Sequence, residues 1–176
     1  MRCRYYAARS GDMFCKGRYQ VVSAVGRGVF SSVLCAKDTH RFDAEVAIKV
    51  IRSNEVMSKL AQKELTLLEE LRANDPEDRK HVVKLLHHFK HKGHLCFVFE
   101  KYDANLRDVI KKFGKGVGIN IAAVRSYGKQ MLIALAHMAK CSIMHADIKP
   151  DNMLVNKARN IGACASPGPT PLSLPE

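Results

Sequence analysis

Residues 145–152 read HADIKPDN, a short segment that brings together a carboxylate, an ammonium and an amide at Asp147, Lys149 and Asn152. A carboxylate can accept or orient the proton of a hydroxyl, a lysine can contact a phosphate, and an amide oxygen can bind magnesium. Together these are the groups that would place a hydroxyl against a magnesium-bound γ-phosphate. A solvated polar turn is the alternative interpretation, and the rest of the sequence must decide between the two.

Upstream of this segment, a lysine lies inside an apolar strand. Residues 46–49 read VAIK, and an unpaired Lys49 ammonium in such a strand would cost roughly several kcal/mol of desolvation. Glu64 is the candidate partner, because it falls on the same helical stripe as Leu60 and Leu68 and its carboxylate should face the protein. We expect an ion pair between Lys49 and Glu64. The alternative is a solvated Glu64 at the edge of the stripe.

A turn with glycines precedes the VAIK strand. Residues 26–33 read GRGVFSSV, so that Gly26 and Gly28 stand where a backbone could approach a ligand without an intervening Cβ. This suits a loop that covers a phosphate. The pattern by itself fits an ordinary hairpin turn equally well.

Apolar periodicity predicts strands in the first half of the chain and helices in the second. One helix is expected among the strands, and turn-forming residues end it at 74–76. The expected strands are 19–25, 32–36, 45–51, 81–90 and 94–100. The expected helices are 55–72, 106–113 and 121–140. The fold class is therefore α+β.

Composition narrows the class of protein. The chain has 176 residues, 47% of them hydrophobic and 26% charged, which is typical of one globular domain. It has no apolar run of membrane-spanning length and no signal-peptide pattern, so we expect an intracellular protein without membrane contact. The 6 cysteines form no C-x-x-C pair and are interpreted as reduced thiols. The net charge of +12 leaves nucleic acid or an acidic substrate open, although the basic run 84–94 favours a solvated hairpin face.

The glycine-rich loop, VAIK, helical glutamate and HADIKPDN motifs occur in an order that resembles the protein kinase family. The resemblance covers 19 to about 156. Val98-Phe99-Glu100, followed by Asn105-Leu106, resembles the hinge of the CMGC group of kinases. The segments 28–31 and 145–152, with the pair Tyr5-Tyr6, are similar to the family of pre-mRNA-processing-factor-four kinases, which are splicing-associated serine/threonine kinases.

The resemblance implies a kinase-like fold with a five-stranded antiparallel small lobe and one helix. The first helices and the catalytic loop of an incomplete helical lobe would follow. It also implies ATP and Mg²⁺ as cofactors. In the small lobe, Gly26, Gly28, Val33 and Ala47 would line the nucleotide site, and Lys49, paired to Glu64, would hold the α- and β-phosphates.

The remaining roles follow from the same resemblance. Glu100 and Tyr102 would present hinge backbone to adenine, with Phe99 as gatekeeper at the back of the pocket. Asp147 would orient the substrate hydroxyl, Lys149 would reach the transferring phosphate, and Asn152 would bind one Mg²⁺. A protein substrate, spliceosomal partners and a nuclear location are also implied, and direct binding of nucleic acid is not expected.

The sequence departs from the kinase pattern at several positions. Ser31 stands in place of the third glycine, and Ala146 replaces the arginine of the usual H-R-D. More severely, no aspartate follows Asp151, so the Asp-Phe-Gly that chelates magnesium is missing from these residues. We therefore expect a truncated and inactive chain. The alternatives are a non-catalytic fragment that binds nucleotide or a partner, and, less favoured, a basic RNA-binding module.

Four segments are expected along the chain. Residues 1–18 would be an N-terminal extension, 19–100 the small lobe, and 101–156 the start of the large lobe with the catalytic loop. Residues 157–176 are rich in alanine, glycine, serine and proline and carry no core-forming pattern. They are interpreted as a tail outside the kinase-like region, without a fixed fold.

Overall fold

The structure is a computed structural model that describes residues 5–156 and 161–164. The chain forms two compact units. The sheet unit comprises Met1–Lys63 and Lys84–Lys101, and the helical unit comprises Glu64–Val83 and Tyr102–Glu176. The sheet unit ends at Lys101, close to the boundary expected at residue 100. The segment 64–83, which is expected in the small lobe, belongs instead to the helical unit.

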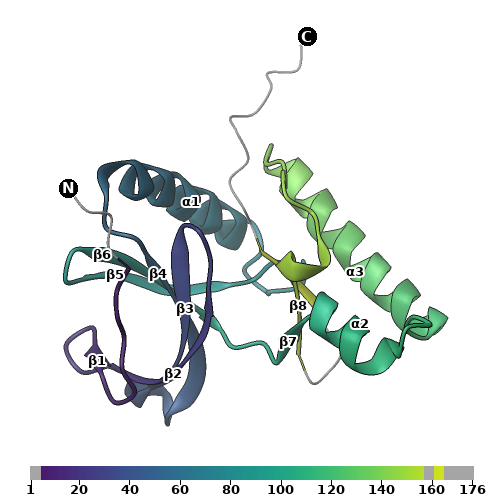
Figure 1. Cartoon of the computed structure of the whole chain (residues 1–176). Helices are drawn as coiled ribbons and strands as arrows, with labels where there is room; N and C mark the ends of the chain where they lie inside the picture. Colours follow the sequence, from purple (N-terminus) through teal and green to yellow (C-terminus); the bar gives the residue numbers. More distant parts are fainter. Residues whose placement is uncertain (1–4, 157–160, 165–176) are drawn as a thin grey trace. The chain divides into compact units, whose positions relative to one another are not determined.

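The sheet unit is built on a six-stranded sheet in which every neighbouring pair is antiparallel (Figure 1). The strand order is β1-β2-β3-β4-β6-β5. The strands are β1 (Met13–Phe14), β2 (Tyr19–Arg27), β3 (Ser31–Asp38), β4 (Ala44–Ile51), β5 (Leu85–His91) and β6 (His94–Glu100), with a short 3-10 helix, η1 (Thr39–Arg41), after β3. Alternate side chains of β2, β3, β4 and β6 form one core together with Phe14 of β1.

Helix α1 (Glu55–Ala73) begins beside Asn54, whose side-chain oxygen accepts a hydrogen bond from the Met57 backbone N–H at 2.6 Å. Such a cap satisfies one of the free N–H groups of the first turn. The predicted apolar stripe is confirmed at Leu68, which is buried together with Ala61, Leu65 and Leu71 of the same helix. It is wrong at Leu60, whose side chain is 44% exposed because it lies at the edge of the helical face.

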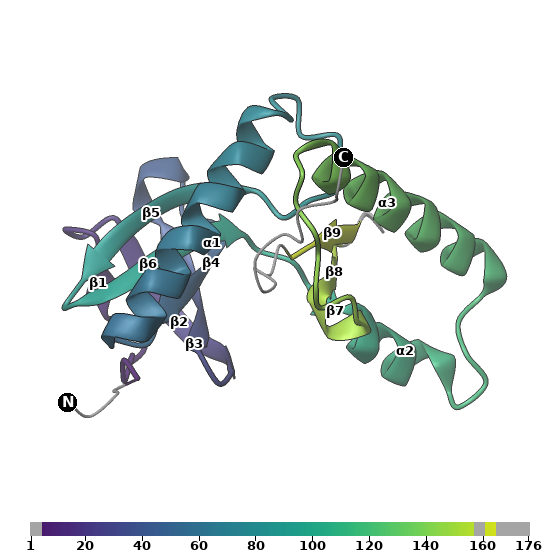
Figure 2. The same ribbon diagram turned by 90° about the horizontal axis from the view of Figure 1, so that it is seen from above.

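The helical unit packs helices against a small three-stranded sheet (Figure 2). Its strands are β7 (Ala104–Asn105), β8 (Met153–Val155) and β9 (Ile161–Ala163), in that order across the sheet. Its helices are the second half of α1, α2 (Leu106–Gly114), α3 (Ile121–Lys140) and the 3-10 turn η2 (Pro150–Asn152). Asn105 and Asn120 cap α2 and α3, and a ring nitrogen of the buried His137 lies 3.1 Å from the Leu71 carbonyl oxygen.

Strand β9 corrects the interpretation as a tail for residues 161–163. Ile161 and Ala163 are buried in the core of the helical unit, and β9 pairs with β8. The segment is too short and too poor in large apolar side chains to show a periodicity, so long-range pairing decides its structure. Residues 157–160 and 165–176 lie outside the described part of the chain.

The strand predicted at 81–90 also begins later than expected, at Leu85. His81 has a φ of 57°, a left-handed conformation that interrupts an extended strand. Its carbonyl accepts from the Ala163 N–H at 2.8 Å, and the Val83 N–H donates to the Ala163 carbonyl at 2.9 Å. The apolar residues at 82–83 therefore bond to β9 in the helical unit and do not extend β5.

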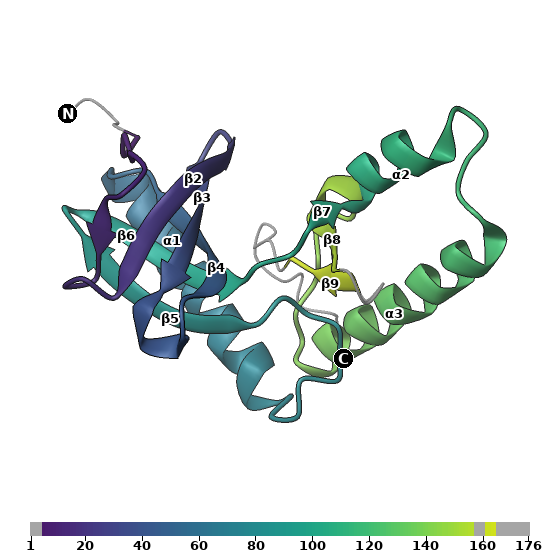
Figure 3. The ribbon, with the colours of Figure 1, turned by 90° about the horizontal axis from the view of Figure 1, so that it is seen from below.

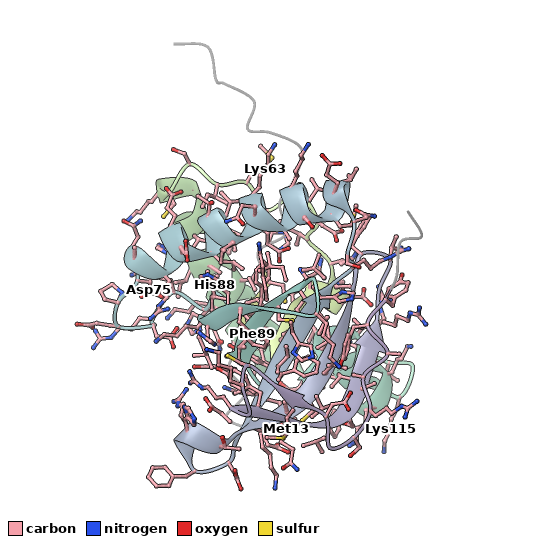
Figure 4. All side chains as sticks on the ribbon, turned by 90° about the vertical axis from the view of Figure 1, so that its left-hand side faces the viewer. Met13, Lys63, Asp75, His88, Phe89 and Lys115 are labelled. Carbon is pink, nitrogen blue, oxygen red and sulfur yellow. The ribbon has the colours of Figure 1, made fainter. Side chains whose placement is uncertain are left out.

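The prediction of a five-stranded sheet missed β1. Met13 and Phe14 pair with Gln20 and Tyr19, and the Phe14 ring stacks on His91 with centroids 4.1 Å apart. Figure 4 labels Met13 on β1 and Phe89 on β5, whose ring stacks on Tyr19 at 5.5 Å. Part of the predicted N-terminal extension thus belongs to the sheet.

Two cysteines of the sheet unit, Cys35 and Cys96, are buried, whereas Cys15 is partly exposed. Burial raises the pKa of the Cys96 thiol to about 12 and also raises the pKa of Cys35. Both thiols are unpaired, as predicted. Among the described residues, no helix combines the length and the apolar character needed to cross a membrane.

Gly162 in β9 is tightly enclosed, which leads to a stability prediction. A Cβ at this position would lie 2.5 Å from the Tyr102 hydroxyl oxygen, 2.8 Å from its Cζ and 3.0 Å from Val83 Cγ2. The Tyr102 ring would have to move to relieve such a contact. We therefore expect Gly162→Ala to lower the free energy of unfolding by about 1–3 kcal/mol, measured by urea denaturation.

Gly128→Ala is the matched control in the same unit. Gly128 lies within α3, and a Cβ there would meet nothing within 4 Å. Alanine is favoured over glycine by up to about 1 kcal/mol in a helix interior, so this variant should be as stable as the wild type or more so. A Gly162→Ala variant as stable as Gly128→Ala would contradict the packing described for β9.

Candidate active site

One face of the sheet carries the residues that sequence motifs assign to the nucleotide. Along β4, the side chains of Val46, Ile48 and Val50 are buried in the core, while those of Ala47 and Lys49 are half-buried. Successive side chains of a strand point to opposite faces, so Ala47 and Lys49 share the face away from that core. The apolar strand around Lys49 is confirmed.

Neighbouring strands add to this face through their register. Lys49 lies opposite Val33 of β3 and opposite Phe97 of β6. In the same way, Ala47 lies opposite Cys35 and Phe99. Directly opposed residues of an antiparallel pair share one face. The predicted residues Val33, Ala47, Lys49 and Phe99 are therefore brought together, and Cys35 and Phe97 join them unpredicted.

The glycine-rich loop connects β2 and β3 at the edge of this face (Figure 3). Gly26 lies opposite Val33, and the Gly28 N–H donates to the Ser31 carbonyl at 2.9 Å to close the turn. A Cβ at Gly26 would meet nothing within 4 Å, and a Cβ at Gly28 would meet only the Ser31 carbonyl oxygen at 3.8 Å. The fold therefore does not itself require glycine here, and the bare backbone leaves room for a ligand.

The catalytic-loop residues predicted from HADIKPDN form one hydrogen-bonded set in the helical unit. Lys149 Nζ lies 2.7 Å from Asp147 Oδ2. The Asn152 side-chain nitrogen donates to Asp147 Oδ2 at 2.9 Å and to the Asp147 carbonyl at 2.8 Å. These bonds use the amide nitrogen of Asn152, so its oxygen Oδ1 is the atom that could bind a hard cation such as Mg²⁺.

The surroundings of Asp147 keep its carboxylate ionised and in place. The hydrogen bond from Lys149, followed by the one from Asn152, holds the pKa of Asp147 below its ordinary value. Its backbone N–H donates to Nδ1 of the buried His145 at 3.3 Å. Two bonds of 2.8 and 2.7 Å from Arg107 of α2 hold Asp151 and lower its pKa as well. Asp147 can therefore accept a hydrogen bond from a hydroxyl at neutral pH.

The remaining predicted residues belong neither to the face around Lys49 nor to the hydrogen-bonded set around Asp147. They are Glu64, Glu100 and Tyr102. Glu64 is 7% exposed, so its carboxylate faces the protein as predicted. Lys49 belongs to the sheet unit and Glu64 to the helical unit, and their ion pair stays a prediction. Glu100 ends β6 and is exposed, whereas Tyr102 is half-buried and its hydroxyl lies against Gly162.

The structure also reveals contacts to the glycine-rich loop that the sequence motifs did not predict. The Tyr5 hydroxyl lies 2.9 Å from the carbonyl oxygens of Gly28 and Val29, and Arg52 donates to the Val29 carbonyl at 2.8 Å. The family resemblance includes Tyr5 but assigns it no role. Within the described residues, no group of three or more His, Cys, Asp or Glu side chains could hold a metal ion.

Comparison with known proteins agrees with this arrangement. The protein kinase domain family matches residues 19–164. The serine/threonine-protein kinase prp4 of Schizosaccharomyces pombe is 52% identical over 144 residues, which cover 82% of this chain and 30% of that protein. The serine/threonine-protein kinase prpf4B of Dictyostelium discoideum is 42% identical over 159 residues, covering 89% of this chain and 19% of that protein.

A further relative is the serine/threonine-protein kinase SRPK of Physarum polycephalum, 38% identical over 86% of this chain and 36% of its own length. The chain thus spans between 19% and 36% of the length of these relatives. The family match ends at residue 164, directly after β9, so β9 belongs to the kinase-like region and not to a tail. The chain belongs to the protein kinase family.

Proposed function

We propose that this chain is the part of a serine/threonine protein kinase that binds ATP and orients the hydroxyl that receives the phosphate. The observation that carries the proposal is the hydrogen-bonded set of Asp147, Lys149 and Asn152. It combines a proton acceptor, a cation and an amide oxygen within one loop, as phosphoryl transfer to a hydroxyl requires.

In the sheet unit, the proposed nucleotide site is the face that carries Ala47 and Lys49. Gly26, Gly28 and Val33 would cover the nucleotide, with backbone N–H groups close to its phosphates. Lys49 would bind the α- and β-phosphates, and Glu64 would pair with Lys49 to fix its position. Phe99 would close the back of the pocket, and the backbone at Glu100 and Tyr102 would meet adenine.

In the catalytic loop, Asp147 would accept a hydrogen bond from the substrate hydroxyl and orient the hydroxyl oxygen toward the phosphate. Lys149 would neutralise charge on the transferring phosphate, and Asn152 Oδ1 would bind one Mg²⁺. When bound, Mg²⁺ supplies positive charge that stabilises the phosphate oxygens during transfer. The contribution of this loop is orientation, since its side chains are already held by one another.

The substrate class is proposed from the relatives and the family resemblance. The relatives are named serine/threonine-protein kinases, which favours serine or threonine as the acceptor. The resemblance to splicing-associated kinases favours splicing proteins as substrates and the nucleus as the location. These proposals concern the whole protein. The relatives are several times longer than the segment that matches this chain.

The nucleotide site is tested by Lys49→Met. We expect Mg·ATP to raise the melting temperature of the wild-type chain, because a ligand that binds only the folded state stabilises it. Loss of a charge-assisted contact worth about 1.5–3 kcal/mol should weaken ATP binding by roughly 10- to 100-fold. Isothermal titration calorimetry measures the dissociation constant directly.

Lys59→Met is the matched control, since Lys59 is exposed on α1 and its Nζ pairs with Glu55 at 3.0 Å. It should bind ATP like the wild type. If Lys49→Met and Lys59→Met bind ATP equally well, the proposed nucleotide face is wrong. If RNA binds instead, with an affinity that falls steeply with salt, the alternative of a basic RNA-binding module is favoured.

A further inference from the structure

The tip of the glycine-rich loop receives little support from the sheet itself. Val29 and Phe30 are large apolar residues at this tip, and both are exposed. Two backbone hydrogen bonds hold the tip, one from the Gly28 N–H to the Ser31 carbonyl at 2.9 Å and one from the Arg52 N–H to the Phe30 carbonyl at 3.1 Å. A tip with exposed side chains has few other contacts to lose when it opens. A side chain that bonds the loop backbone from outside the hairpin therefore adds to the few contacts that fix its position.

Tyr5 is such a group, and it comes from the segment before β1. Its hydroxyl lies 2.9 Å from the carbonyl oxygens of both Gly28 and Val29, so the single hydroxyl proton can be shared between them. Arg52, which follows β4, donates to the Tyr5 hydroxyl at 3.3 Å and to the Val29 carbonyl at 2.8 Å. The loop tip is thus bonded to two segments outside its own hairpin.

The ring of Tyr5 is contacted by two guanidinium groups. The Arg27 Cζ lies 3.7 Å from the ring centroid and the Arg52 Cζ lies 4.3 Å from it. A cation over an aromatic face is attracted by the ring quadrupole, and two such contacts limit rotation of the ring. Arg27 ends β2, so the clamp includes one strand of the hairpin that it supports.

The direction of these bonds matters for anion binding. Phosphates are recognised by backbone N–H groups, whereas backbone carbonyl oxygens repel them. The carbonyls of Gly28 and Val29 are engaged by Tyr5 and Arg52. These bonds keep the two carbonyls from turning toward a phosphate. They also order the loop before the nucleotide binds, which lowers the entropic cost of binding.

We propose that Tyr5 is a positioning residue for nucleotide binding, which clamps the glycine-rich loop through its hydroxyl and its ring. The nucleotide part of this inference rests on the proposed function. The clamp itself is a property of the chain without ligand, and it can be measured separately.

The test compares Tyr5→Phe and Tyr5→Ala in the 176-residue chain. Hydrogen–deuterium exchange of a peptide spanning 26–32, measured without nucleotide, reports opening of the loop. Loss of the hydroxyl should speed this exchange by about two- to tenfold, the range expected from one net hydrogen bond. The dissociation constant of a fluorescent N-methylanthraniloyl-ATP should rise by a similar factor. Tyr5→Ala, which also loses the ring, should exceed Tyr5→Phe in both measurements.

Tyr6→Phe is the matched control, because the Tyr6 hydroxyl lies 3.3 Å from His91 Nε2 and 3.5 Å from Lys92 Nζ, and none of these groups lies in the loop. It should leave loop exchange and nucleotide affinity unchanged. Equal loop exchange in Tyr5→Phe, Tyr6→Phe and the wild type would overturn the inference. If the wild type binds no nucleotide analogue, the proposed function fails, and the exchange data still decide whether Tyr5 holds the loop.

Discussion

A polypeptide of these 176 residues is expected to bind ATP and yet transfer no measurable phosphate to a protein substrate. Asp147 and Asn152 are in place. After Asp151, however, the sequence contains no aspartate, and its single acidic residue is Glu176. Transfer requires a second carboxylate that holds magnesium against the phosphate. Asp147→Ala should therefore change nothing measurable in this polypeptide, because residues that act as a unit have strongly non-additive effects.

The same substitution should have a very large effect in a longer form that supplies the missing carboxylate. Positioned proton acceptors contribute about 10²- to 10⁴-fold to a rate, so Asp147→Ala should lower kcat/KM by that range. A radiolabelled-ATP assay on both forms, each with and without the substitution, measures the difference. Robust transfer by the 176-residue polypeptide, abolished by Asp147→Ala, would refute the argument from the missing carboxylate.

Asp38→Ala is expected to cause a large loss of stability in the sheet unit. Arg18 binds the Asp38 carboxylate through two bonds of 3.0 and 2.8 Å, and Asp38 also accepts from the His40 backbone N–H at 3.1 Å. The Asp38 side chain is 2% exposed. Removing it leaves the Arg18 guanidinium, whose side chain is 27% exposed, without this carboxylate, which should lower the free energy of unfolding by about 1–3 kcal/mol.

Glu45→Ala is the control for Asp38→Ala, because the Lys101–Glu45 pair at 2.6 Å lies in the same unit but is much more exposed. Exposed pairs contribute about 0.2–1 kcal/mol, so urea unfolding should separate the two variants clearly. A loss for Asp38→Ala no greater than that for Glu45→Ala would contradict the role assigned to the Arg18–Asp38 pair.

The Arg18–Asp38 pair also predicts an acid dependence. The hydrogen bond from Arg18 holds the pKa of Asp38 below its ordinary value, although burial opposes this shift. A carboxylate whose folded-state pKa is depressed stabilises the fold fully above its unfolded pKa of about 3.9. That contribution is lost as the pH falls below this value and through the folded-state pKa. Asp38→Asn should flatten the stability profile in this acid range.

The sequence was sufficient to predict those parts of the site whose residues lie close together along the chain. Asp147, Lys149 and Asn152 lie within one short loop, and the alternation around Lys49 lies within one strand, so spacing alone predicts which side chains meet. The helices were predicted for the same reason, since their periodicity repeats over many residues.

The pairing of very short segments could not be predicted in this way. Strand β1 and strand β9 are each too short to show a period. Strand β1 is placed by its pairing with β2, and β9 is placed by its pairing with β8 and by backbone hydrogen bonds to the distant residues His81 and Val83. The contact of Tyr5 with Gly28 spans 23 positions and follows no local rule. Such contacts depend on how the whole sheet is assembled.

The N-terminal segment finally bears on where the domain can be cut. The family match begins at residue 19, yet Phe14 is fully buried and Tyr6 packs edge-on against it at 5.2 Å. A recombinant chain that starts at Tyr19 would lose one strand of its sheet and uncover apolar surface on the others. A fragment that keeps all six strands of the sheet and the packing on Phe14 therefore has to begin before the family match, at Tyr6 or earlier.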